Sequence, residues 1–333
     1  MEKTTDSFLL TQEKRTILML QACEVVRDVA RHVLAMGEKP QSIYNTLEVA
    51  KHQFTTLDAE GASQLRASIE HRMPEFHGMV LEESEIPRAL GAGSVCFPLL
   101  IADAVEGSTN AKRGLSALIR RPVLAGSSVA ILEAETLGSI AASAFFDYST
   151  GNVFSSVRTG QGEFLSFFNG QLLHPRTPEI LSIRGDSQQY VVVPGYSHDN
   201  VEARAEIERV LLDAGFRTTG GTRSSAQDLL DILGSQVDAY VDLRSHFPGS
   251  TTSQDEVLHV WDVGGLLPVL EGLGFIITDA RGQGWQKCRL GEKLALVVSR
   301  PNISQRVLEA VNRLSFLEGD EAGAETIRMT HPV

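Results

Sequence analysis

Apolar residues recur at helical spacing near the start of the chain. Between residues 11 and 36 they fall on one face of a helix with 3.6 residues per turn, at positions Ile17, Leu20, Val25, Val29 and Val33. Gly37 ends this predicted helix, because glycine readily takes the left-handed conformation that closes a helix C-terminus. A connector over residues 51–58 then leads into a second predicted helix over residues 59–73, which Pro74 ends.

Short apolar runs separated by turn residues predict strands in the middle of the chain. The run over residues 95–102 contains Pro98, which favours an edge strand or a strand that starts late. Glycine-containing turns separate the runs that follow, so we predict that these strands pair antiparallel. The predicted strands of this region cover residues 79–81, 95–102, 128–132, 140–146 and 153–157.

Strands and helices alternate through the second half of the chain, which is typical of α/β layering. Apolar residues become sparse around residues 175–190, where Pro175 and Pro178 lie. We therefore predict an N-terminal α+β domain over residues 1–185 and a C-terminal α/β domain over residues 186–333. The predicted strands of the second half cover residues 190–193, 237–241, 275–278 and 294–298, and its predicted helices cover 201–214, 225–233, 261–273 and 304–317.

Composition and charge argue against several classes of protein. The 333 residues carry a formal net charge of −12, which argues against nonspecific nucleic-acid binding. The three cysteines, Cys23, Cys96 and Cys288, lack metal-ligand spacing and do not indicate a disulfide framework. No N-terminal targeting signal appears, and no apolar run approaches the ~20 residues of a membrane span. We therefore expect a cytoplasmic protein without a nucleic-acid or membrane partner.

Two acidic residues, three positions apart, follow the apolar run over residues 95–102. Asp103 is expected at the end of the strand, and Glu106 precedes Gly107-Ser108-Thr109, which can open a helix. The free N–H groups of a helix N-terminus bind phosphate, and carboxylate oxygens are the ligands that Mg²⁺ prefers. The stretch is thus suited to hold a cation beside a phosphate. A solvated turn or a helix cap is the plainer interpretation of the same residues.

Further acidic blocks occur in an order that matches a known family. Glu82-Glu83-Ser84 lies upstream of the acid pair, and Trp261-Asp262 lies far downstream, before small and apolar residues. With these blocks the sequence resembles the inositol monophosphatase and fructose-1,6-bisphosphatase superfamily of magnesium-dependent, lithium-sensitive phosphomonoesterases. The resemblance extends over about residues 12–300, and weaker matching blocks are Phe54–Asp58, Gly160–Gly170 and Val237–Asp242.

The resemblance implies a fold, an activity and a cofactor. The implied fold is a layered α-β-α-β-α sandwich that combines α/β and α+β parts. The implied activity is that of a phosphoric monoester hydrolase, in which a metal-activated water attacks a small phosphorylated metabolite, an inositol phosphate or a sugar phosphate. The implied cofactor is Mg²⁺, two or three ions per active site, with Mn²⁺ as a substitute. A homodimer is expected because the family is commonly dimeric.

The resemblance also assigns metal ligands. Glu83, Asp103 and the Val105 carbonyl would hold one metal ion. Asp103 would bridge to a second ion, held together with Glu106 and Asp262. Each acid has a plainer interpretation as well: Glu83 as a solvated strand end, and Asp262 as an acid that complements the dipole of a helix.

Other residues would act on water, phosphate and substrate. Glu83 and Ser108, helped by Asp58, would orient the attacking water. The backbone N–H groups of Gly107 and Ser108 would hold the phosphate. Asp58 can instead be a helix cap, and Arg223 can instead be a plain surface charge. The residues expected to contact the substrate are Asp242, Arg223 and Ser225.

The sequence departs from the family pattern within the central motif. Glu106 replaces an aspartate and Ala104 replaces a proline, so the second metal site or the backbone must differ. The segment over residues 243–260 is predicted to be a long loop, either a lid that contacts substrate through Arg244 and His246 or a surface excursion. Two other functions therefore stay open: a 3′-phosphoadenosine 5′-phosphate-type nucleotide phosphatase, and a catalytically silent relative that binds a phosphorylated ligand.

Overall fold

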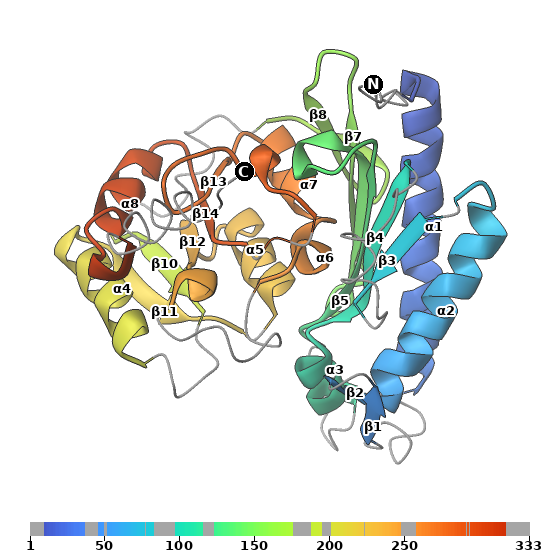
Figure 1. The fold of residues 1–333 in the computed structure, drawn as a ribbon, viewed down its shortest axis with the longest axis horizontal. Helices are drawn as coiled ribbons and strands as arrows, with labels where there is room; N and C mark the ends of the chain where they lie inside the picture. Colours follow the sequence, from blue (N-terminus) through green and yellow to red (C-terminus); the bar gives the residue numbers. More distant parts are fainter. Residues whose placement is uncertain are drawn as a thin grey trace, which may run out of the picture.

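The computed structural model shows two β-sheets with helices between them and on their outer faces. Figure 1 shows α1 and α2 outside the first sheet, α5, α6 and α7 between the sheets, and α4 and α8 outside the second sheet. These layers form an α-β-α-β-α sandwich, which confirms the predicted fold class. The structure describes residues 10–36, 46–49, 52–76, 78–82, 97–115, 123–175, 188–194, 201–222, 224–247, 258–290, 292 and 294–317.

The first sheet has seven strands in the order β3-β4-β5-β6-β7-β8-β9. β3 and β4 run parallel, and each later pair is antiparallel, as the turns predict. β4 lies between β3 and β5, so Pro98 delays the start of an inner strand and does not mark an edge. The strands span Gly78–Leu81 (β3), Leu99–Glu106 (β4), Gly126–Leu132 (β5), Ile140–Asp147 (β6), Asn152–Arg158 (β7), Phe164–Phe168 (β8) and Gln171–Leu173 (β9).

The second sheet has five strands in the order β11-β10-β12-β14-β13. β10 pairs parallel with β11 and β12, whereas β14 pairs antiparallel with β12 and β13. β8, β9 and β11 were not predicted from the apolar pattern. The strands span Tyr190–Val193 (β10), Arg217–Gly220 (β11), Ala239–Asp242 (β12), Ile276–Thr278 (β13) and Leu296–Ser299 (β14).

Eight α-helices carry the labels α1 to α8, and α5 coincides with its prediction. Ser224 caps α5 by accepting a hydrogen bond from the backbone N–H of Gln227, and Gly234 ends the helix. α8 stops earlier than the predicted 304–317. The helices span Gln12–Met36 (α1), Thr56–Arg72 (α2), Ser108–Leu115 (α3), Val201–Asp213 (α4), Ser225–Leu233 (α5), Val260–Val263 (α6), Leu267–Gly272 (α7) and Ser304–Val311 (α8).

The buried face of α1 differs in part from the predicted one. Val25, Val29 and Val33 are fully buried, but Ile17 and Leu20 are 42% and 56% exposed. The buried positions toward the start of α1 are instead one or two residues away, at Leu18, Met19 and Ala22. α1 packs on β5, β6 and β7, and each fully buried apolar side chain there contributes about 1.5–3 kcal/mol to folding.

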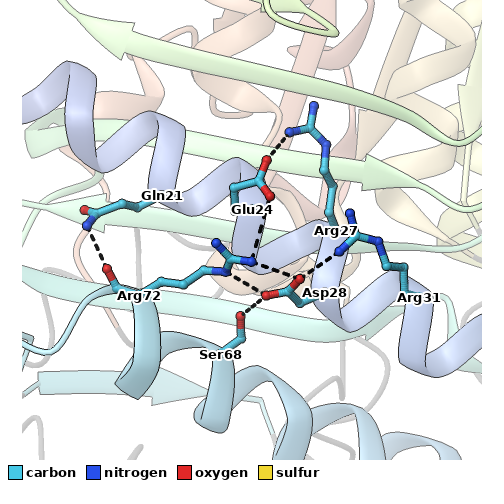
Figure 2. Close-up of polar contacts among 7 residues, drawn as sticks. All are labelled: Gln21, Glu24, Arg27, Asp28, Arg31, Ser68 and Arg72. Atoms are coloured by element: carbon cyan, nitrogen blue, oxygen red, sulfur yellow. Dashed lines mark hydrogen bonds and ion pairs between the residues drawn. The ribbon is translucent and has the colours of Figure 1, made fainter.

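A polar network holds α1 against α2 (Figure 2). Arg72 on α2 donates to both carboxylate oxygens of Asp28 on α1, at 2.7 and 3.2 Å, and Ser68 donates to the same carboxylate at 2.9 Å. Gln21 donates to the backbone carbonyl of Arg72 at 2.7 Å. Burial raises the pKa of Asp28, but the hydrogen bonds from Arg72 and Ser68 prevail and hold it below its usual value. The network fixes the helix whose first turn carries Asp58.

The chain ahead of α2 differs from the predicted connector over residues 51–58. Two short antiparallel strands, β1 (Thr46–Val49) and β2 (His52–Thr55), form a separate pair. α2 begins directly after β2, three residues earlier than predicted. Asp58 therefore lies inside the first turn of the helix and not in a connector.

The predicted helix over residues 261–273 is two helices, α6 and α7, separated at Gly264-Gly265. A Cβ atom at Gly265 would lie 2.6 Å from the carbonyl oxygen of Ala144 on β6. The N–H of Gly265 donates to the hydroxyl of Ser128 on β5 at 3.1 Å. The chain breaks here because glycine allows the backbone to reach the sheet, and tertiary contact outweighs helix propensity.

Three hydrophobic clusters fill the spaces between the layers. One lies under α1 and α2, a second surrounds α5, α6 and α7 between the sheets, and a third lies between the second sheet and α4 and α8. The first sheet ends with β9 at Leu173 and the second begins with β10 at Tyr190. The predicted domain boundary at residue 185 falls among residues 176–187, outside the described residues, and stays a prediction. In the described part of the chain, no helix combines the length and apolarity needed to cross a membrane.

Candidate metal and phosphate site

A bulge in β4 brings two of the predicted metal ligands to the same side of the strand. β4 continues through Asp103 to Glu106, so the strand does not end at Asp103 as expected. Residues three apart on a regular strand point to opposite faces. Here the register against β5 shifts, because Asp103 pairs with Ser128 and Glu106 pairs with Gly126. The extra residue in β4 reverses the alternation of side chains between the two faces of the sheet. The Asp103 carboxylate stabilises the bulge by accepting a hydrogen bond from the Val105 N–H at 2.8 Å.

Asp262 joins this pair from the other half of the sequence. It lies in the single turn of α6, which packs against β4 and β5. Its carboxylate accepts the backbone N–H of His259 at 2.8 Å, which orients it. Asp103, Glu106 and Asp262 each offer a carboxylate oxygen, and these oxygens all lie within 4.8 Å of one another. Their exposed fractions are only 1%, 9% and 9%.

The electrostatics of the cluster fit a divalent cation. Burial raises the pKa of Glu106, and the nearby carboxylate of Asp262 raises it further. Burial likewise raises the pKa of Asp262. Three close carboxylates out of water are costly when ionised, and a cation among them relieves the cost. Since all of the donors are hard carboxylate oxygens, the cluster suits a hard divalent cation.

Glu106 also reaches from the first sheet to the start of α5. Its Oε1 accepts the Ser224 hydroxyl and the Ala226 backbone N–H, each at 3.2 Å. The α5 N-terminus is a favourable place for a carboxylate because its N–H groups carry partial positive charge. Glu106 therefore links the acidic cluster to the start of α5.

The predicted phosphate-binding residues follow Glu106 directly. Gly107 has a φ of +82°, and a Cβ atom there would lie 2.8 Å from the Cβ of Ser224, so only glycine fits. Ser108 is the first residue of α3, as the sequence predicts. Asn110, which sequence analysis missed, donates to the backbone carbonyls of Leu124 and Thr222 at 3.0 and 2.7 Å. These two bonds tie α3 to the segment before β5 and to the segment before α5.

Asp58, another assigned residue, lies in the helix that packs against β4. Asp58 is 6% exposed in the first turn of α2. One turn later, a Cβ atom at Gly61 would lie 2.8 Å from the Val105 side chain, so α2 packs closely on β4. The roles of Asp58 and of the Val105 carbonyl stay predictions. Glu83 and Arg223 lie outside the described residues.

Asp242 is fully buried and is held by its neighbours. Its carboxylate accepts the Tyr240 hydroxyl at 2.8 Å, and it accepts Nε and Nη2 of Arg244 at 2.9 and 2.6 Å. Nη2 of Arg244 also lies 3.4 Å from the hydroxyl of Ser225. Arg244 is therefore paired beside the sheet, in a short 3₁₀ turn, and does not project from an open loop as expected. Residues 248–257 of the predicted loop lie outside the described residues, so its role stays a prediction. The predicted substrate contacts of Asp242 and Ser225 stay predictions.

Solved structures resemble this chain in fold. The extragenic suppressor protein SuhB of Bartonella henselae aligns with a TM-score of 0.62 at 15% identity, covering 90% of this chain and 99% of that one. Inositol monophosphatase II of Staphylococcus aureus gives 0.61 at 13% identity, covering 95% and 99%. An inositol monophosphatase/NADP phosphatase with NADP and Ca²⁺ gives 0.63 at 14% identity, covering 92% and 98%. The fold is that of the inositol monophosphatases. No protein-family description and no curated protein matches the sequence.

Within the inositol monophosphatase fold, the structure assembles part of the predicted site. It brings Asp103, Glu106 and Asp262 together, with Gly107 and Ser108 next in the chain. Sequence analysis missed three contributors, and they are Asn110, Ser224 and the pairing of Arg244 with Asp242. Ser224 had an available signal, since a serine directly before an apolar helical run is a typical N-cap.

Proposed function

We propose that this protein is a Mg²⁺-dependent phosphomonoesterase that hydrolyses a small phosphorylated metabolite, an inositol phosphate or a sugar phosphate. The observation that carries the proposal is the acidic cluster. Asp103, Glu106 and Asp262 come from two distant parts of the sequence and meet at the start of α3. The inositol monophosphatase fold around the cluster supports the same activity.

The three clustered acids, together with Glu83, would hold the metal ions. When bound, Mg²⁺ would supply positive charge to the phosphate and make a neighbouring water a better nucleophile. The N–H groups of Gly107 and Ser108 would hold phosphate oxygens at the positive end of α3. Ser108, Glu83 and Asp58 would orient the attacking water.

The solved neighbours support a small phosphorylated substrate. One inositol monophosphatase II is bound to inositol monophosphate, and the same protein is also bound to 2′-AMP. Another neighbour is complexed with NADP. The nucleotide-bound neighbours favour a second candidate function, a nucleotide phosphatase of the 3′-phosphoadenosine 5′-phosphate type. A cytoplasmic location and a homodimer remain expectations.

Phosphate release from a panel of esters tests the proposal. The panel is inositol 1-phosphate, fructose 1,6-bisphosphate, 3′-phosphoadenosine 5′-phosphate and p-nitrophenyl phosphate, each with Mg²⁺ and with EDTA. We expect Mg²⁺-dependent release, and we expect Asp103→Asn to reduce kcat at least 100-fold. Asp213→Asn, which changes an exposed carboxylate on α4, is the matched control and should leave kcat unchanged.

Two results would contradict the proposal. If folded Asp103→Asn keeps most of its turnover, the metal assignment is wrong. If no ester is hydrolysed but inositol 1-phosphate or 3′-phosphoadenosine 5′-phosphate still binds in calorimetry, the protein is the catalytically silent relative.

A further inference from the structure

Asn110, in the first turn of α3, links the start of that helix to both halves of the sequence. Its Nδ2 donates to the backbone carbonyl of Leu124 at 3.0 Å, just ahead of β5. It also donates to the backbone carbonyl of Thr222 at 2.7 Å, just ahead of α5. A side-chain amide has two N–H donors, and both are used here. One side chain therefore holds the start of α3 at two points.

Thr222 is held in turn by α5. Its backbone N–H donates to Oδ1 of Asp228 at 2.7 Å, and its hydroxyl donates to the backbone carbonyl of Ser224 at 3.2 Å. Asp228 is fully buried in the first turn of α5. A Cβ atom at Gly221 would lie 2.5 Å from Oδ2 of Asp228, so the chain passes directly over this carboxylate. Hydrogen bonds thus connect Asn110, the backbone of Thr222 and Asp228 in series.

The candidate site lies at the same contact between α3 and α5. A Cβ atom at Gly107 would lie 2.8 Å from the Cβ of Ser224, and Oε1 of Glu106 accepts the Ser224 hydroxyl at 3.2 Å. The Gly107 carbonyl accepts the backbone N–H groups of Asn110 and Ala111, at 2.8 and 3.0 Å. The N–H groups left for a phosphate are therefore those that precede Asn110 in the chain. The position of α3 relative to α5 sets where these groups point.

We propose that Asn110 and Asp228 are positioning residues for the phosphate site. Through Thr222 they hold the start of α3 against the start of α5, so that the N–H groups of Gly107 and Ser108 face the place beside the acidic cluster. The inference rests on the proposed function, because that function puts a phosphate at these N–H groups. Donors held in place before the ligand arrives bind it more tightly, because less conformational freedom is then lost on binding.

The metal ligands are oriented by other contacts. The Asp103 carboxylate accepts the Val105 N–H within the bulge of β4, and the Asp262 carboxylate accepts the His259 N–H at the start of α6. Neither contact involves α3. Loss of the Asn110 amide should therefore weaken phosphate binding much more than Mg²⁺ binding.

Isothermal titration calorimetry on the full chain measures this difference. The probes are Mg²⁺ alone and inorganic phosphate in the presence of saturating Mg²⁺. Asn110→Leu keeps the approximate shape of the side chain and removes both donors. We expect the Kd of phosphate to rise at least fivefold and that of Mg²⁺ to change less than twofold. Asn152→Leu, which removes an exposed hydrogen bond with Asn169 at the start of β7, is the matched control and should change neither Kd.

Two variants at Asp228 test the second link. Asp228→Leu removes the acceptor of the Thr222 N–H and should raise the Kd of phosphate at least threefold. Asp228→Asn keeps a carbonyl oxygen for that N–H and should bind phosphate within twofold of the wild type. A neutral side chain suits this place, because burial raises the pKa of Asp228 to about 7. Thermal melts show which variants are folded, and Asn110→Ala replaces Asn110→Leu if the latter does not fold.

The proposal is overturned if the folded variant at Asn110 binds phosphate like the wild type, because the two bonds would then serve stability alone. It is also overturned if Mg²⁺ binding weakens as much as phosphate binding, or if Asp228→Asn binds phosphate as weakly as Asp228→Leu. If the wild type binds no phosphate, this inference and the proposed function both fail. If it binds phosphate but hydrolyses no ester, only the proposed activity fails.

Discussion

Replacing Arg244 by methionine should expose the energetic role of the buried ion pair beside the candidate site. Arg244 and Asp242 have side-chain exposures of 7% and 0%, and their closest atoms are 2.6 Å apart. Arg244→Met removes the donors Nε and Nη2 and keeps an unbranched chain of similar length. The Tyr240 hydroxyl and the backbone N–H of residue 244 remain as donors to the carboxylate.

The expected loss of stability can be estimated from the cost of leaving the buried Asp242 carboxylate without its cationic partner. Removing one partner of a buried pair leaves an uncompensated charge, which costs about 3–5 kcal/mol. The unfolding entropy of a 333-residue chain is about 0.7 kcal/mol/K, so the melting temperature should fall by about 4–7 °C. Burial raises the pKa of Asp262, and the Arg244 guanidinium works against that effect. The variant removes this positive charge and leaves Asp242 unpaired, so it should bind Mg²⁺ more tightly.

Differential scanning calorimetry, with and without Mg²⁺, measures both effects. The matched control is Arg209→Met, which breaks an exposed pair with Asp213 on α4 at 3.7 Å. Exposed pairs of this kind contribute about 0.3–0.5 kcal/mol, so the control should melt within about 1 °C of the wild type. Adding Asp242→Asn to Arg244→Met removes the unpaired charge and should restore part of the lost stability.

Two outcomes would refute this reasoning. If Arg244→Met melts like Arg209→Met, the pair does not carry the energy that its burial implies. If the double variant is no more stable than Arg244→Met, the loss comes from packing and not from the stranded carboxylate.

Three further predictions concern α5, the glycine break and the acidic cluster. Burial raises the pKa of Asp228 to about 7, so the free energy of unfolding should fall from pH ~4 to 7, by at most ~1.4 kcal/mol per pH unit. In urea titrations at pH 5 and 8, the free energy of unfolding of Asp228→Asn should change less with pH than that of the wild type. If the pH dependence is unchanged, it comes from other titratable groups. Gly265→Ala should cost about 1–3 kcal/mol and lower kcat, while Gly160→Ala, with open space around its Cβ, should do neither. In Glu106→Asp the carboxylate should reach less far toward α5. We expect a lower free energy of unfolding and a different millimolar lithium concentration for half inhibition. If neither quantity changes, Glu106 does not belong to the site.

Local signals were sufficient for several elements of this fold. α5 was predicted with Gly234 at its end, and α1 follows from a long apolar periodicity. The exact buried face of α1 did not follow, because Ile17 and Leu20 lie at helical spacing yet point away from the sheet. Which stripe of a helix is buried depends on the partner sheet, and a single segment does not contain that information.

The candidate site could likewise be predicted only in part from the sequence. The acids of the cluster were identified from their order in the chain and from a family resemblance. The bulge that turns Asp103 and Glu106 to one side depends on the register with β5, which strand periodicity does not specify. The partners of Glu106 and Asp242 come from contacts made in three dimensions. The break in the predicted helix over residues 261–273 had one local signal, the pair Gly264-Gly265, which periodicity outweighed.

The seating of Gly265 against the first sheet also affects when the candidate site can exist during synthesis. Asp103 and Glu106 leave the ribosome long before Asp262, and the first sheet is complete at Leu173. Domains fold as units from the N-terminus during translation, so this sheet can form while its cluster still lacks an acid. Only when the segment with Asp262 and Gly265 docks do the three carboxylates meet. A nascent chain therefore should not retain the metal ion that all three carboxylates hold until nearly four-fifths of it has been made, and truncation before Asp262 should yield a folded first sheet without stabilisation by that ion.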